Sequence, residues 1–278
     1  MKKNFILPAV FILFLLFPVS QTRAAGETDL FVGSEPALSF GKADAGGNGA
    51  EGDAGQEEKW EDEWEVAEAL ADPLEPVNRL FFHFNDKLYY WVLEPVARVY
   101  SGFVPEEMQI AVRNFFDNLE APARAVNSLL QGNVRGSASD VARFTLNSTV
   151  GIIGFGDFAR DVFGLQSSNE DLGQTLAHYG AGGGFYINWP FLGPSNLRDS
   201  LGMLGDGYLH PFILLDVDRD VTTGLRTFDV VNSTALTLGD YELFVGSALD
   251  PYATVKDAYQ QYRNGLIQNN GSISIYTK

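Results

Sequence analysis

The stretch LFFHFNDKLYYWVLEPVARVYSGFV, from Leu80 to Val104, decides the fold class of this chain. Read as a helix, it carries apolar residues on nearly its whole circumference, with only four charged residues as exceptions. Such a helix is buried on all sides, in a large core or in lipid, and Tyr and Trp rings with polar tips suit a water–lipid interface. Pro95 is expected to kink this helix or split it in two. The segment leaves both alternatives open, a central core helix and a membrane-contacting helix.

Helix-start signals occur on both sides of this stretch. Asp72-Pro73 and Asp250-Pro251 each place a capping carboxylate before a proline that suits the first helical position. Pro105, followed by two glutamates, predicts another start, because acidic groups are favoured at the positive end of a helix. The last helix is expected to stop at Asn269-Asn270-Gly271, and the only strand candidate is Phe185–Phe191. The chain is therefore predicted to be mainly α, with apolar loops rich in Gly and Pro.

The N-terminal part has the composition of a targeting signal followed by a flexible tail. Two lysines precede an apolar run and small residues follow it, which predicts a signal peptide at residues 1–24, cleaved after Ala24. An uncleaved membrane anchor is the alternative. Residues 25–70 are predicted to be an acidic, Gly-rich flexible tail, since they lack the apolar content to form a core. Residues 26–76 hold fifteen Asp and Glu against two Lys, which gives −13 of the total net charge of −17.

Composition and motifs argue against several classes of function. The net charge of −17 argues against nucleic-acid binding, because phosphate contacts require clustered Lys and Arg. There is no cysteine, so disulfides, thiolate metal sites and an acylated Cys are excluded. His83, His178 and His210 lack metal-ligand spacing, and no nucleophile-elbow motif occurs. We expect no enzymatic activity, no metal and no cofactor. A periplasmic hydrolase with an unrecognised site is kept as a minor hypothesis.

A series of short motifs runs in order from about residue 71 to residue 270. The motifs are Asp72-Pro-Leu-Glu-Pro-Val-Asn-Arg79, Phe82-His-Phe-Asn85, Tyr100-Ser-Gly-Phe-Val-Pro105, Asn114-Phe-Phe-Asp-Asn-Leu-Glu120, Leu129-Leu-Gln-Gly132, Arg143-Phe-Thr-Leu-Asn-Ser-Thr149, Glu170-Asp-Leu-Gly-Gln-Thr-Leu176, Tyr179-Gly180, Pro190-Phe-Leu-Gly-Pro-Ser195, Leu197-Arg-Asp199 and Asp250-Pro-Tyr252. In this order and spacing the series resembles the MlaA (VacJ) family, the outer-membrane component of a bacterial phospholipid-asymmetry system. Residues 71–270 are therefore predicted to be an MlaA-like helical domain, and residues 271–278 a C-terminal tail.

The resemblance implies a ring-like bundle of helices embedded in one membrane leaflet, at the periplasmic face of the outer membrane. It implies a phospholipid transfer protein that removes mislocalised phospholipids from the outer leaflet and thereby maintains lipid asymmetry. The implied partners are phospholipid, a soluble periplasmic lipid carrier of the MlaC type and a trimeric porin. A non-transporting envelope scaffold bound to porins is the alternative. Many family members are anchored by an acylated Cys; this chain has none, so we expect embedding of the helical domain to retain it.

The resemblance does not fix which residues contact lipid, so we choose them from the aromatic pattern. Two groups are hypothesised to line the lipid path or to contact the membrane, one in the aromatic helix and one in the Gly/aromatic loop. They are Phe81, Phe82, Phe84 and Asn85, and Phe185, Tyr186, Trp189 and Phe191. Ordinary packing in the protein interior is the alternative for each.

Overall fold

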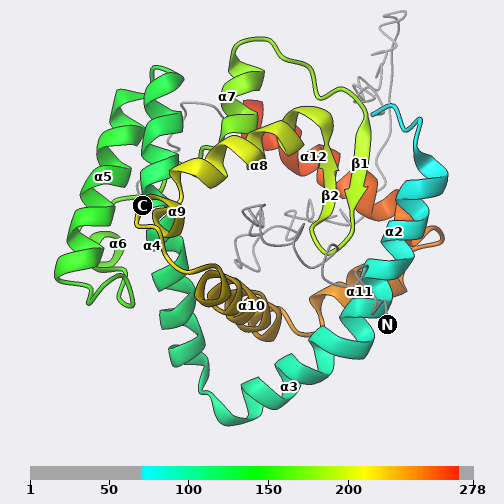
Figure 1. Cartoon of the computed structure of the whole chain (residues 1–278), viewed down its shortest axis with the longest axis horizontal. Helices are drawn as coiled ribbons and strands as arrows, with labels where there is room; N and C mark the ends of the chain where they lie inside the picture. The colour runs from blue at the N-terminus through cyan, green and yellow to red at the C-terminus, as the bar shows by residue number, and fades with distance from the viewer. Residues whose placement is uncertain (1–69, 269–278) are drawn as a thin grey trace, which may run out of the picture. The chain divides into compact units, whose positions relative to one another are not determined.

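The structure, a computed structural model, describes residues 70–268. This part of the chain is mainly helical, as predicted, and its helices are arranged round a ring (Figure 1). The predicted signal peptide, acidic tail, C-terminal tail and helix stop at Asn269-Asn270-Gly271 all lie outside the described residues.

The elements follow one another through mostly short connections. In chain order they are α2 (Glu75–Leu88), the π-helix η1 (Tyr89–Leu93), α3 (Glu94–Phe103), α4 (Glu106–Leu130), α5 (Val134–Thr149), α6 (Phe158–Phe163), α7 (Leu172–His178), β1 (Tyr186–Trp189), β2 (Gly193–Asn196), α8 (Leu197–Leu209), α9 (Pro211–Leu214), α10 (Arg219–Leu236), α11 (Asp240–Gly246) and α12 (Pro251–Gln268). None of the described helices combines the length and the apolarity that a membrane span needs.

Elements far apart in sequence meet to close the ring (Figure 1). Helix α10 packs against both α3 and α4, and α12 packs against α7 and β2. The antiparallel hairpin β1–β2 packs against α2. The predicted strand at Phe185–Phe191 is thus confirmed as β1, and its partner β2 was not predicted.

The aromatic stretch Leu80–Val104 runs through α2, η1 and α3 in one helical path. The N–H of Glu94 bonds to the carbonyl of Tyr89, five residues back, directly before Pro95. This wider turn accommodates a proline, which has no N–H and whose ring would crowd a regular α-helical turn. The break that was predicted at Pro95 is therefore a π-helical turn that precedes it.

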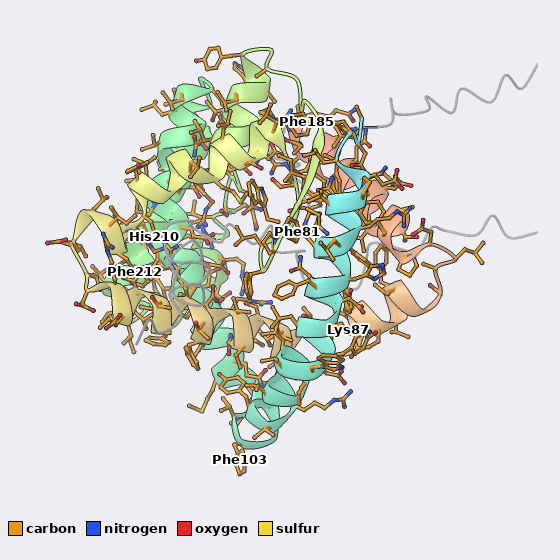
Figure 2. All side chains as sticks on the ribbon, turned by 45° about the vertical axis from the view of Figure 1, so that its right-hand side comes forward. Phe81, Lys87, Phe103, Phe185, His210 and Phe212 are labelled. Atoms are coloured by element: carbon orange, nitrogen blue, oxygen red, sulfur yellow. The ribbon has the colours of Figure 1, made fainter. Side chains whose placement is uncertain are left out.

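Nearly all apolar side chains of this stretch are exposed or half-buried. Trp91 is 74% exposed and Phe103 is 85% exposed, whereas Phe82 and Ala97 are buried. Figure 2 shows Phe103 projecting from the end of α3, away from the other labelled residues. The core-helix alternative is therefore wrong. We name the exposed apolar side chains of these three elements the apolar stripe. Its members are Val77, Leu80, Phe84, Trp91, Val92, Val96, Val99 and Phe103.

The interior of the described part is unusually polar. Twenty of its polar or charged side chains are buried, against twelve apolar ones. Asn78, Asn127, Asn188 and Asn232 are among its largest fully buried side chains. A domain surrounded only by water normally shows the opposite distribution, with apolar residues inside and polar residues outside. Hydrogen-bond networks therefore hold much of this fold together, and much of its apolar surface faces outward.

The predicted helix starts are confirmed at two places and wrong at one. Helix α4 begins directly after Pro105, and Asp250 accepts hydrogen bonds from the first backbone N–H groups of α12. Asp72 does not cap a helix, since α2 begins later, at Glu75, without a side-chain cap. Its carboxylate instead accepts hydrogen bonds from the Asn78 amide and the Tyr252 hydroxyl, and so connects the two ends of the described chain.

Candidate functional site

The two predicted groups of aromatic residues meet where α2 packs against the hairpin. The Asn85 side chain donates a hydrogen bond to the carbonyl of Trp189 (2.8 Å) and accepts one from the N–H of Phe191 (2.7 Å). The rings of Phe84 and Phe191 lie edge to face, with their centroids 4.9 Å apart. Since Asn78 also bonds to β1, two amides that are two helical turns apart attach one face of α2 to the hairpin.

The tip of the hairpin is strained. Trp189 pairs with Gly193, and between them Phe191 has a φ of 68°, in the left-handed region that a bulky residue rarely adopts. Such a conformation costs roughly 1–3 kcal/mol and persists only where the surroundings impose it. Asn85 imposes it here through its two hydrogen bonds to the tip, and the Trp189 indole is fixed by donation to the Ser200 hydroxyl (2.9 Å).

The predicted residues differ in exposure. Phe82 and Tyr186 are 6% and 0% exposed and form an aromatic cluster with Tyr252 and Tyr259, so in this conformation they contact protein. Phe84 is exposed, and the remaining predicted residues are half-buried, including the two labelled in Figure 2. Contact of the predicted set with lipid stays a prediction.

A cavity of about 80 Å³ lies between α4, the residues before α7, and helices α8 to α10. Figure 2 labels two of its lining residues, His210 and Phe212. The wall combines aromatic, acidic and basic side chains. It consists of Phe116, Glu120, Ala123, Arg124, Glu170, Asp171, Asp206, His210, Phe212, Arg226 and Asp229. The arrangement offers charges of both signs beside two phenyl rings, which suits a ligand that is itself part charged and part apolar.

Two carboxylates in this wall lack a counter-cation. Asp206 accepts hydrogen bonds from the amide of Asn127 (2.7 Å) and the backbone N–H of Leu172 (2.9 Å), and burial raises its pKa to about 6. Glu170 is 5% exposed and accepts a hydrogen bond from the Gln131 amide (2.9 Å), and burial likewise raises its pKa. Within residues 70–268, neither carboxylate forms an ion pair.

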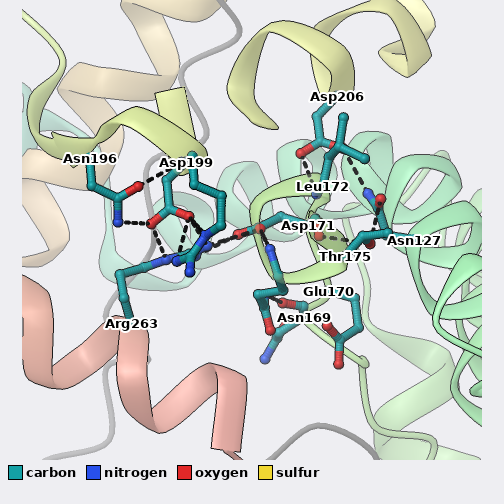
Figure 3. Close-up of polar contacts among 12 residues, drawn as sticks. Asn127, Asn169, Glu170, Asp171, Leu172, Thr175, Asn196, Asp199, Asp206 and Arg263 are labelled. Atoms are coloured by element: carbon teal, nitrogen blue, oxygen red, sulfur yellow. Dashed lines mark hydrogen bonds and ion pairs between the residues drawn. The ribbon is translucent and has the colours of Figure 1, made fainter. Parts of the chain in front are cut away.

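The third acidic group of this region, Asp171, belongs to a buried ion-pair network (Figure 3). The guanidinium of Arg263, on α12, donates two hydrogen bonds to Asp171 (2.6 and 3.0 Å) and two to Asp199 on α8 (2.8 and 3.0 Å). Burial disfavours the charge on Arg263, but its hydrogen bonds and the two carboxylates outweigh this and raise its pKa. The network fixes the start of α7, and with it the adjoining Glu170, against α8 and α12.

His210 and Arg226 complete the cavity wall from α8–α10. Burial lowers the pKa of His210 to about 4, so the imidazole is neutral near pH 7 and its Nδ1 accepts a hydrogen bond from the N–H of Phe212 (3.2 Å). Burial also lowers the pKa of Arg226, opposed by the charge of Glu120. Among the described residues, no group of acidic or histidine side chains has the geometry to hold a metal ion.

Sequence reasoning missed the cavity. Glu170 and Asp171 stood in a motif that carried the family resemblance, but no pattern distinguished Asp206, His210 or Arg226. These residues come from separate helices and meet only when the ring closes, so a single sequence contains no spacing that joins them. The i, i+4, i+8 repeat of Phe116, Glu120 and Arg124 on α4 was the one local signal available.

Comparison with known proteins decides the family. A family model described as MlaA lipoprotein matches residues 70–265, most of the chain. The chain belongs to the MlaA lipoprotein family. This confirms the resemblance inferred from the motif series.

Curated relatives and a solved structure agree with this membership. The intermembrane phospholipid transport system lipoprotein MlaA of Escherichia coli is 35% identical over 206 residues, 73% of this chain and 80% of the relative. The protein of the same name from Haemophilus influenzae is 31% identical, covering 68% of this chain and 76% of the relative. A structure solved as the structural basis for maintenance of bacterial outer membrane lipid asymmetry is 33% identical, with a TM-score of 0.63. It covers 71% of this chain and 99% of its own, which supports the ring of helices as the MlaA fold.

Proposed function

We propose that this chain removes mislocalised phospholipids from the outer leaflet of a bacterial outer membrane and passes them to a soluble periplasmic carrier. The proposed partners are phospholipid, a carrier of the MlaC type and a trimeric porin. The observation that carries the proposal is the inverted polarity of the described part, with the apolar stripe outside and amides, carboxylates and guanidiniums inside. The names of the family relatives, which refer to intermembrane phospholipid transport, support the same function.

The proposed mechanism follows from this distribution of polarity. The apolar stripe contacts acyl chains of the surrounding leaflet. Transfer of the exposed apolar side chains of Trp91, Val99 and Phe103 from water to acyl chains is favourable. The polar interior offers hydrogen-bonding groups to a lipid headgroup, whose transfer into hydrocarbon alone would cost several kcal/mol or more. Moving a lipid in this way breaks no covalent bond, so the proposal needs no catalytic residue.

The apolar stripe also provides a physical basis for membrane retention without an acylated cysteine. Burying a large apolar side chain in an apolar medium is worth about 1.5–3 kcal/mol. Trp91, Val92, Val99 and Phe103 are 74%, 48%, 61% and 85% exposed, so together they supply about 4–8 kcal/mol on this basis. A single myristoyl chain binds membranes with a constant of about 10⁴ M⁻¹, or roughly 5.5 kcal/mol. The contribution of these four residues is thus comparable to that of one acyl chain.

The test uses a Gram-negative strain that lacks its own homologous gene and expresses this chain. We expect restored lipid asymmetry, measured as less surface-exposed phosphatidylethanolamine after labelling with an impermeant amine reagent. We also expect the chain in the outer-membrane fraction, with phospholipids that co-purify with it in detergent and are identified by mass spectrometry. A chain that restores nothing and carries no phospholipid would refute the proposal, and restored porin association without bound lipid would favour the scaffold alternative.

A further inference from the structure

Helix α5 and the loop that follows it are apolar on the outside and charged only on the inside. In Figure 1, α5 lies at the edge of the ring opposite α2, and it packs chiefly against α4 and α6. Asp140, in the middle of α5, is fully buried, and Arg143 pairs with Asp157 (2.8 Å). Residues 144–156 carry no charge. We name the exposed side of α5 and of this loop the uncharged face. Its members are Val134, Ala138, Val141, Thr145, Thr149, Val150, Ile152, Ile153 and Phe155.

The polar donors of this face find their acceptors within the protein. The hydroxyl of Thr145 donates to the carbonyl of Val141 (2.9 Å), and the hydroxyl of Thr149 donates to the carbonyl of Thr145 (2.7 Å). Most backbone N–H groups of the loop bond to carbonyls of the loop itself or of the end of α5. They are the N–H groups of Gly151, Ile153, Gly154, Phe155 and Gly156. Water satisfies such groups at an ordinary surface, whereas hydrocarbon cannot, so internal pairing of this kind suits hydrocarbon surroundings.

The loop holds two isoleucines in a strained conformation. Ile152 and Ile153 have φ values of 54° and 59°, in the left-handed region that a β-branched residue adopts only as an outlier. Their side chains are 72% and 61% exposed, so packing against the protein does not account for isoleucine at these positions. Glycine would adopt the same backbone conformation without strain. Since strain of this kind is concentrated at functional sites, we expect the two side chains to contact a binding partner.

Close contacts keep the loop in this shape. A Cβ atom at Gly151 would lie only 2.3 Å from the carbonyl oxygen of Gly156, so the two ends of the loop approach each other more closely than any larger residue allows. The ring of Phe155 stacks on that of Phe115 on α4, with their centroids 5.1 Å apart and their planes 16° apart. The loop is therefore preformed, and little conformational entropy is lost when its isoleucines are buried.

We propose that the uncharged face is a second membrane-contact surface, from which Ile152 and Ile153 insert among lipid acyl chains. Its lack of charge matches hydrocarbon, which does not solvate charges, and its internally paired donors meet the requirement of that medium. A protein partner is a poorer match, because protein interfaces are anchored mainly by Trp, Tyr and Arg, whereas this face presents mainly Val, Ile and Thr. The inference rests on the proposed function, and extends lipid contact from the apolar stripe to the opposite edge of the ring (Figure 1).

The first test reports the surroundings of a single side chain. The chain has no cysteine, so Ile153→Cys introduces one site for a fluorescent dye. The labelled full-length protein is transferred from detergent into vesicles of phosphatidylethanolamine and phosphatidylglycerol that contain a phospholipid with a doxyl quencher on its acyl chain. We expect quenching of the dye. The matched control is Asn169→Cys, because Asn169 is exposed and has a φ of 54° but lies outside the uncharged face; its dye should not be quenched.

The second test separates lipid contact from a structural role. A double variant with Ile152→Gly and Ile153→Gly removes both side chains and relieves the strain, so its thermal midpoint should not fall. Its binding to the same vesicles without quencher, measured by flotation over a series of lipid concentrations, should weaken by about thirtyfold or more, the factor expected for two largely exposed aliphatic side chains. A purely structural role predicts the opposite, a lower midpoint with unchanged binding. Asn169→Gly, at a position with the same backbone conformation, should leave binding unchanged.

The outcomes distinguish this inference from the proposed function. An Ile153→Cys dye that is not quenched while the protein floats, or a double variant that binds vesicles as the wild type does, overturns the second surface and leaves phospholipid transfer standing. A dye that becomes shielded only when a porin is added shows that a protein covers this face, and also overturns it. A wild-type protein that neither floats nor carries phospholipid overturns both. Quenching confined to Ile153→Cys, together with weaker binding of the double variant, supports the surface.

Discussion

Arg263→Met tests whether the buried ion-pair network closes the ring. Arg263 is 4% exposed and its four hydrogen bonds join α12 to Asp171, before α7, and to Asp199 on α8 (Figure 3). The Met side chain fills a similar volume but donates no hydrogen bond. Asp171 would then lose its cation, and Asp199 would keep only its ion pair with Arg198.

The expected cost follows from this geometry. Removing one partner of a buried ion pair typically destabilises a protein by about 3–5 kcal/mol, because the remaining charge stays buried. For a domain of about 200 residues, each kcal/mol lowers the thermal midpoint by roughly 2–4 °C. We therefore expect the midpoint of Arg263→Met to fall by about 6–20 °C. Thermal unfolding in detergent, followed by circular dichroism, measures this shift.

A matched control and a pH series sharpen this prediction. Arg98→Met removes an exposed arginine that pairs with Glu94 within one helix, and it should leave the midpoint unchanged. Burial opposes ionisation of Asp171, but the Arg263 hydrogen bonds outweigh burial and lower its pKa below the ordinary 3.8. The wild type therefore has this stabilisation above pH 3.8 and loses it as the pH falls through the lowered pKa. A midpoint shift below about 2 °C at pH 7, or a difference that grows in acid, would refute the reasoning.

Three further predictions concern the lipid-facing surface and the cavity. Phe84→Asp should impair lipid transfer or membrane insertion more than Ala50→Asp in the acidic segment, because Phe84 packs against the hairpin tip; equal effects in the surface-labelling assay would contradict this. Phe103→Asp should weaken binding to phospholipid vesicles by about tenfold or more, with an unchanged thermal midpoint in detergent, since this ring is exposed; unchanged flotation with vesicles would count against the apolar stripe. Burial lowers the pKa of His210 to about 4, so the free energy of unfolding of the wild type falls as the pH drops from 6.5 to 4. His210→Asn lacks this loss, and its free energy of unfolding relative to wild type should rise by about 3 kcal/mol over that range, measured by denaturant unfolding. Asp206 acts in the opposite sense, since its raised pKa of about 6 gives stability below pH 3.8 that is lost as the pH rises through 6. A stability difference between His210→Asn and wild type that does not change with pH would refute the assignment of His210.

Local signals in the sequence were sufficient for most helices. Pro105 and Asp250 each marked a helix start, because a helix N-terminus needs an acceptor for its free N–H groups or a residue that lacks one. Asp72 carried the same signal and failed as a cap, since its carboxylate is used in a tertiary contact with Asn78 and Tyr252. A capping motif thus predicts a helix start only where no distant partner competes for the same oxygens.

The pattern of Leu80–Val104 predicted apolar surroundings but not which kind. Hydrophobic periodicity reports that a side chain avoids water, and it is the same for a protein core and for a lipid layer. The exposure of Trp91 and Phe103 excludes the protein core, because it depends on what the rest of the chain covers. The cavity was unpredictable for a related reason. Its charged residues come from several helices, and their approach is determined only by closure of the ring.

Under the proposed function, the polar interior and the apolar exterior follow from one constraint. Where apolar surroundings replace water, burying an apolar side chain between helices gains little, so helices associate through hydrogen bonds and close packing instead. Asn232 shows how this works, since it donates to the carbonyl of Gln109 on α4 (2.9 Å) and accepts from the Tyr100 hydroxyl on α3 (2.7 Å). Asn127 likewise donates to Asp206, one of the two carboxylates without a counter-cation (2.7 Å). The amides that hold the helices together therefore also orient charged groups of the cavity, so helix association and the shape of the cavity wall depend on the same hydrogen bonds.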